Sequence, residues 1–113
     1  MERKTRYAYF QRVAKEIRTI ASNYFVALKK VNSKKRKRCL SDSSSGESIY
    51  QRHVRRVKSA YDQLDSLEQS FINNDFFYEN YPEWWKKNFS KSSYYRLRRI
   101  SMVHFLEAFQ NEN

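Results

Sequence analysis

The chain has 113 residues and a formal net charge of +11 at neutral pH, from 23 lysines and arginines against 12 aspartates and glutamates. Its 40% hydrophobic and 17% aromatic content is enough to fold one small domain and excludes a wholly disordered chain, while its single glycine and single proline argue against a β-rich fold with many tight turns. The excess of positive charge favours a polyanionic partner, namely DNA, RNA or an anionic membrane surface.

A long first helix is predicted for residues 6–31, because apolar side chains recur there at alternating steps of three and four residues. This stripe consists of Phe10, Val13, Ile17, Ile20, Tyr24, Leu28 and Val31. Two interpretations fit it: the core helix of a bundle, or a dimerising helix that forms a homodimer through residues 10–31 as a short coiled coil. We assign residues 1–32 to this N-terminal segment.

Residues 33–48 lack periodicity and are predicted to form a flexible linker, rich in serine after a basic start. Its five consecutive cations are candidates for phosphate contacts: Lys34, Lys35, Arg36, Lys37 and Arg38. A solvated linker is the alternative, and in a eukaryotic protein the same run would resemble a nuclear-import signal. Ser48 is expected to cap the helix that follows.

The second helix is predicted for residues 49–64. Its apolar stripe consists of Tyr50, Val54, Val57, Tyr61 and Leu64. Its cations are expected to lie outside this stripe, namely Arg52, Arg55, Arg56 and Lys58.

A short third helix is predicted for residues 66–77. A capping box is expected at its start, formed either by Asp65 with Glu68 or by Ser66 with Gln69. The side chains that this helix is expected to bury are Leu67, Phe71 and Ile72.

A fourth and a fifth helix are predicted around a tight turn. The fourth is brief, residues 82–87, with Pro82 in its first turn, where the missing N–H is tolerated. Asn88 tolerates the left-handed backbone that ends a helix, and Ser90 is expected to cap a fifth helix that runs to about Phe109.

The fifth helix has two chemically different sides. The side expected to pack inward consists of Tyr94, Leu97, Ser101, Phe105 and Ala108. The opposite side of its N-terminal half displays Lys91, Ser92, Tyr95, Arg96 and Arg99, with Arg98 at the edge. Together with the preceding Lys86 and Lys87, these are our candidate DNA-binding residues, because the second helix of a helix-turn-helix lies in the major groove, where arginine pairs with guanine and lysine or serine contacts phosphates.

A second apolar face on the fifth helix is formed by Met102, Leu106 and Phe109. A helix at the edge of a bundle needs only one apolar face, so we expect the stripe of residues 10–31 to cover this second face, within the chain or from a second subunit. A surface of RNA polymerase is the alternative cover.

Residues 54–109 also resemble a known family, through LDSLEQSFINNDFFY (64–78) and FSKSSYYRLRRISMVHFLEAF (89–109). Both segments are similar to the C-terminal part of ArpU-type late transcription regulators of phages, which resemble the region-four helix-turn-helix of sigma factors. The resemblance implies that residues 49–113 form a sigma-like helix-turn-helix domain, that the protein is a DNA-binding transcription regulator, and that RNA polymerase is a partner.

This chain departs from the family pattern at two places. Asn88 stands where glycine is usual in the turn, and Trp84 and Trp85 stand where small or aliphatic residues are usual. The tryptophans are expected to cover the core; stacking on a nucleotide or docking into a partner is the alternative.

The candidate catalytic groups are few. His53 and His104 are isolated, Cys39 is the only cysteine, and one glycine cannot form a phosphate-binding loop. We therefore expect no enzyme activity and no cofactor. The alternatives to a DNA-binding regulator are an RNA- or ribosome-binding protein and an adaptor on RNA polymerase without sequence-specific DNA contacts.

The sequence predicts an all-α fold: a small helical bundle with a long N-terminal helix and a C-terminal helix-turn-helix. No apolar run approaches 18 residues, and the N-terminus has no apolar segment typical of a signal peptide. We therefore expect a cytoplasmic protein that does not interact with membranes.

Overall fold

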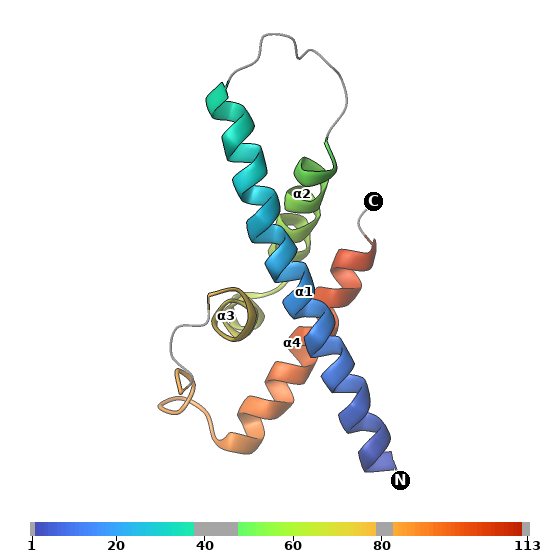
Figure 1. The fold of residues 1–113 in the computed structure, drawn as a ribbon. Coiled ribbons are helices and arrows are strands. Elements are labelled where there is room, and N and C mark those ends of the chain that lie inside the picture. The colour runs from blue at the N-terminus through green and yellow to red at the C-terminus, as the bar shows by residue number, and fades with distance from the viewer. Residues whose placement is uncertain (1, 38–47, 79–82, 112–113) are drawn as a thin grey trace.

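The computed structural model describes residues 2–37, 48–78 and 83–111, and the side chains of all of these except 2–7 and 34–37. The fold is all-α, as predicted, with no strand in the described ranges (Figure 1). Its elements are α1 (Glu2–Lys37), α2 (Ile49–Asp62), α3 (Ser66–Ile72), the π-helical turn η1 (Asn73–Phe77) and α4 (Lys91–Asn111).

Helix α1 is the longest element, with 36 residues, and in Figure 1 it runs the length of the molecule. Helix α2 lies beside its C-terminal half, and α4 crosses its N-terminal half. The helix continues to Lys37. Residues 33–37, which the sequence predicts to be part of the linker, are therefore helical. Lysine and arginine have high helix propensity and nothing in 33–37 breaks the helix, which explains the extension. The rest of the predicted linker, residues 38–47, lies outside the described residues.

The core lies where α1 crosses α2 and α4. It consists of Val13, Ala14, Ile17, Ile20, Val57, Ala60, Leu64, Ile72, Phe76, Met102, Phe105, Leu106, Ala108 and Phe109. The α1 stripe thus packs inward, which agrees with the first of the two interpretations, the core helix of a bundle. It also covers the second apolar face of α4 within the same chain, because Met102 and Leu106 belong to the same cluster as Val13 and Ile17.

Two predicted helix caps are present. The Ser48 side chain accepts a hydrogen bond from the Gln51 amide, and the Gln51 side chain accepts one from the Ser48 amide in return. Asp65 and Glu68 form the same reciprocal pair at the start of α3, which decides between the two capping boxes considered for this helix. Both boxes satisfy amide groups that the first helical turn leaves without a backbone partner.

Two side chains on α2 and α3 lie opposite to expectation. Leu67 is 41% exposed, whereas Phe71 and Ile72 of the same helix are fully buried. Arg56 turns inward and is half-buried: its guanidinium lies 4.1 Å from the ring centre of Phe109 and donates a 3.0 Å hydrogen bond to the Phe109 carbonyl oxygen. The face of the ring attracts the cation, and the partial negative charge at the C-terminal end of α4 attracts it as well.

The predicted fourth helix is wrong for the residues that the structure describes, because 83–88 form consecutive turns. The bonds Lys86 N to Glu83 O and Asn88 N to Trp85 O, both 3.1 Å, each span three residues and do not propagate into an α-helix. Residues 78–90 therefore connect η1 to α4, and α4 does not follow a helix across a three- or four-residue turn.

Candidate nucleic-acid interface on α4

Helix α4 begins where the sequence predicts. The Ser93 amide donates a 3.2 Å hydrogen bond to the Ser90 hydroxyl, and the Tyr94 amide donates one of 2.9 Å to the Ser90 carbonyl oxygen. Ser90 is therefore the N-cap. This cap fixes the first turn of the helix, which carries Lys91 and Ser92.

The inward side of α4 is anchored by aromatic packing. Tyr94 is buried, its ring stacks on Trp85 with 4.4 Å between ring centres, and it stacks on Phe71 of α3 at 5.6 Å. Trp84 contacts Phe71 edge to face at 5.1 Å, and Phe89 lies against the same ring at 5.6 Å. Both tryptophans therefore cover the edge of the packed interior, as predicted.

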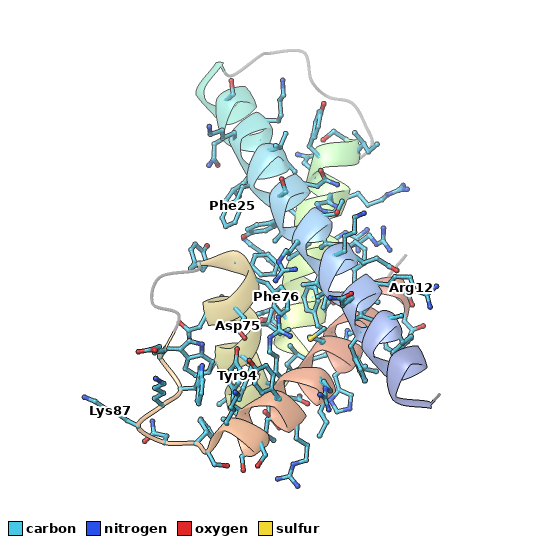
Figure 2. The ribbon with its side chains drawn as sticks, turned by 60° about the horizontal axis from the view of Figure 1, so that its bottom comes forward. Arg12, Phe25, Asp75, Phe76, Lys87 and Tyr94 are labelled. Atoms are coloured by element: carbon cyan, nitrogen blue, oxygen red, sulfur yellow. The ribbon has the colours of Figure 1, made fainter. Side chains whose placement is uncertain are left out.

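A single carboxylate, that of Asp75 in η1, ties three segments together and lies close to Tyr94 of α4 (Figure 2). It accepts hydrogen bonds from Trp84 Nε1 at 2.9 Å, the Tyr94 hydroxyl at 2.5 Å and Arg98 Nε at 2.9 Å. Burial, and then the hydrogen bond to Asp75, raises the pKa of Tyr94, which keeps its hydroxyl protonated as a donor. The carboxylate thereby holds the N-terminal half of α4 in a fixed position.

Arg98 belongs to this internal network and not to the outer surface. Its side chain is 19% exposed and pairs with Asp75, and its guanidinium lies 5.0 Å from the ring centre of Phe76. Through these contacts Arg98 helps to position α4. Of the predicted DNA-binding residues on α4, Arg98 is the one that the structure places inside.

The remaining predicted residues of α4 are exposed on one side: Lys91, Ser92, Tyr95, Arg96 and Arg99. Arg99 lies beside α1, with its guanidinium 5.5 Å from the ring centre of Phe10. The sequence has no aspartate or glutamate between residues 84 and 106, so this side of α4 carries positive charge without a neighbouring acid on the same helix. It is suited to phosphate and base contacts.

The other predicted contacts differ in their surroundings. Lys87 is exposed and extends away from the fold in Figure 2, whereas Lys86 is exposed but paired with Glu83 at 2.9 Å. Lys34 to Lys37 lie in the last turns of α1, where the structure describes the backbone alone, and Arg38 lies outside the described residues.

Sequence reasoning does not identify Asp75 as a key residue. Its three donors come from 9, 19 and 23 residues further along the chain, and no local pattern links them. The only local signal is an acid between apolar residues, Ile72 and Phe76, at the end of a predicted helix. In the structure that position falls in a π-helical turn, a feature that often marks functional sites.

The two histidines make structural contacts. His53 Nε2 donates a 3.2 Å hydrogen bond to the Ile20 carbonyl oxygen, and His104 pairs through Nδ1 with Glu68. Across the described ranges, no group of three or more His, Cys, Asp or Glu side chains is arranged to hold a metal ion. None of the helices in the same ranges is long and apolar enough to span a bilayer.

No protein-family model, curated protein or solved structure matches this chain.

Proposed function

We propose that this protein is a double-stranded DNA-binding transcription regulator that places the N-terminal half of α4 in the major groove. The observation that supports this function best is the exposed side of α4 opposite the Asp75 network. Its five polar or cationic side chains are displayed together, at the end of a helix that buried contacts hold rigidly. Binding groups on a rigid helix lose little conformational freedom when they meet a ligand.

The chemistry of these side chains fits a duplex. Arg96 and Arg99 have the planar donor fork that pairs with guanine O6 and N7, and Lys91 and Ser92 suit phosphate oxygens at the first helical turn. Helix α3 packs against α4 and takes the place of a supporting helix, although a longer connection joins the two than in a tight helix-turn-helix. From the resemblance to sigma-like regulators alone, we also propose that the protein acts together with RNA polymerase.

Selection of bound sequences from a random duplex pool, with RNA hairpins and single-stranded DNA as competitors, tests this function. We expect an enriched motif and a preference for duplex DNA. In Arg96→Ala with Arg99→Ala, the preference for that motif over random duplex should fall roughly five- to 150-fold per lost guanine contact, since each is worth about 1–3 kcal/mol.

The matched control removes the same charge from α1, through Arg12→Ala with Lys15→Ala, and should keep the preference for the motif. Both residues are exposed and lie on the solvent side of that helix. A pool without an enriched motif, or a double α4 variant with unchanged preference, would show that α4 does not contact bases. Tighter binding to the RNA competitor would favour the RNA-binding alternative.

A further inference from the structure

A second basic region lies at the other end of the molecule from the N-terminal half of α4. The sequence has no aspartate or glutamate in residues 17–33 of α1 or 49–61 of α2. Seven cations fall in these two stretches: Arg18, Lys29, Lys30, Arg52, Arg55, Arg56 and Lys58. In Figure 1 the C-terminal part of α1 and the start of α2 form one end of the molecule, and α4 begins at the opposite end.

Two of these seven cations lie over aromatic rings. The guanidinium groups of Arg18 and Arg56 lie over the rings of Phe76 and Phe109. The other five are all exposed, namely Lys29, Lys30, Arg52, Arg55 and Lys58. We call these five residues the distal basic surface. All seven except Arg56 are exposed, so positive charge is concentrated at the surface of this end of the molecule.

Two residues of the distal basic surface, Arg55 and Lys58, line a pair of adjoining grooves. The first, about 580 Å³, lies between Val31 of α1 and a row on α2 that includes Arg55 and Lys58. The second, about 350 Å³, continues towards η1 and is lined by Tyr24, Tyr61, Asn73 and Tyr78. Lys58 lines both, and Asp62 is the only carboxylate among the described residues that line either groove.

The donors along these grooves are of the kinds that contact phosphates. Lysine and arginine provide charge, and tyrosine provides hydrogen bonds to phosphate oxygens in protein–DNA interfaces. Burial, and then the neighbouring Tyr78, raises the pKa of Tyr24, so that its hydroxyl keeps its proton as a donor. The positive charge beside the grooves therefore favours a phosphate backbone over a cationic partner.

We propose that the distal basic surface binds the phosphate backbone of the same DNA duplex that α4 contacts, outside the segment whose bases α4 recognises. The molecule is 56 Å long, which corresponds to about 16 base pairs at a rise of about 3.4 Å per base pair. A duplex of that length lying along the molecule reaches both basic ends. This inference rests on the proposed function of α4, and it adds a sequence-independent contact to it.

The salt dependence of duplex binding provides the first test. The variant carries Lys29→Gln, Lys30→Gln, Arg52→Gln and Lys58→Gln, all at exposed positions. Each lost phosphate contact should reduce the magnitude of the slope of log K against log salt by about 0.9. The slope of the full variant should therefore be smaller than that of wild type by up to about 3.6, while its preference for the selected motif stays the same. The control keeps the charge, through Lys29→Arg, Lys30→Arg, Arg52→Lys and Lys58→Arg, and should bind with the wild-type slope.

Duplex length provides the second test. Wild-type protein should bind a motif-centred duplex of about 30 base pairs more tightly than one of about 10, which cannot reach both ends of the molecule. The glutamine variant should bind both lengths with similar affinity. An unchanged slope and length dependence in that variant would overturn the inference. So would wild-type protein that bridges two separately labelled duplexes, because the second contact would then lie on another molecule of DNA.

The two proposals fail in different ways. If the α4 double variant keeps its preference while the glutamine variant loses slope, the role of α4 is wrong and the distal basic surface still binds phosphates. If the α4 variant loses its preference while the glutamine variant matches wild type, the proposed function holds and the distal contact is wrong. Circular dichroism of both variants verifies that each one folds.

Discussion

Asp75 shows at the scale of one residue how this fold positions a surface helix. Its side chain is 10% exposed, and its two oxygens accept hydrogen bonds from an indole, a phenol and a guanidinium. A buried carboxylate is tolerated when donors surround it, and the donors in turn depend on it. The part of α4 that carries the candidate interface therefore depends on a residue that does not face the partner.

Replacing Asp75 with asparagine should lower the free energy of unfolding by about 3 kcal/mol, because the buried Arg98 charge loses its counter-ion. Urea unfolding followed by circular dichroism measures this change. The control is Asp62→Asn on the exposed side of α2, which should stay within about 0.5 kcal/mol of wild type. If the two variants are equally stable, the Asp75 network adds no net stability.

Tyr94 links the stability of the fold to alkaline pH. Its pKa is raised by burial and by the bond to Asp75, so the unfolded chain releases this proton above about pH 10 while the folded chain keeps it. The contribution of Tyr94 to the free energy of unfolding is fully present below about pH 10 and is lost as the pH rises further. In Tyr94→Phe the free energy of unfolding should fall less steeply with pH above about pH 10, by up to about 1.4 kcal/mol per pH unit. Urea unfolding at several pH values measures both slopes, and equal slopes would contradict the assignment.

At the scale of the element, the sequence predicts helix faces well where many residues repeat one pattern. The stripe of α1 has seven members, so an error at one position does not alter the result, and Val13, Ile17 and Ile20 are all buried. The inward side of α4 follows for the same reason, with Tyr94 and Phe105 buried. Caps are predictable as well, because Ser48 and Asp65 act on amide groups three residues away.

The sequence predicts poorly what contacts between distant segments decide. The sequence of residues 82–87 favours a helix that begins at Pro82. In the structure Trp84 donates a hydrogen bond to Asp75 and Trp85 stacks on Tyr94, and the turns of residues 83–88 satisfy both contacts. Arg56 and Arg98 lie inward for a similar reason, since their partners Phe109 and Asp75 are remote in the sequence. A cation beside an apolar stripe is ordinarily solvated, and only the folded structure shows the exception.

Both the periodicity of the sequence and the contacts between distant segments are needed to define the candidate interface. Periodicity alone separates Lys91, Ser92 and Arg96 from the buried side of α4, and the structure leaves them exposed. The same periodicity places Arg98 at the edge of the surface, and only the position of Asp75 shows that it points into the fold. The exposed set is therefore smaller than the sequence suggests, and Arg96 and Arg99 become the cations of α4 best placed for base contacts.

At the scale of the whole molecule, the charge segregation of the sequence becomes a separation in space. The acids that the structure describes between Asp62 and Glu83 belong to the end of α2, to α3 and its N-cap, to η1 and to the turns that begin at Glu83. They lie between the start of α4 and the distal basic surface along the chain, and Asp75 among them is used internally. Two basic ends on a body 56 Å long favour an extended contact with one polyanion over a compact contact at a single point.

The packing of α1 also bears on oligomeric state. Val13, Ile17 and Ile20 are at most 8% exposed within a single chain, so a homodimer through residues 10–31 would have to open the core. Opening it would expose several buried side chains, each worth about 1.5–3 kcal/mol. We therefore expect a monomer at micromolar concentration, measured by sedimentation equilibrium.

The same argument predicts the symmetry of the DNA site. A monomer presents a single α4, so the motif selected from a random pool should be one non-palindromic block. A two-fold dimer would instead select two inverted half-sites about 10 base pairs apart, centre to centre. A palindromic motif together with a dimer mass in sedimentation would contradict the monomer. Because the core already covers the middle of α1, the second chain would then have to dock on a surface outside this stripe.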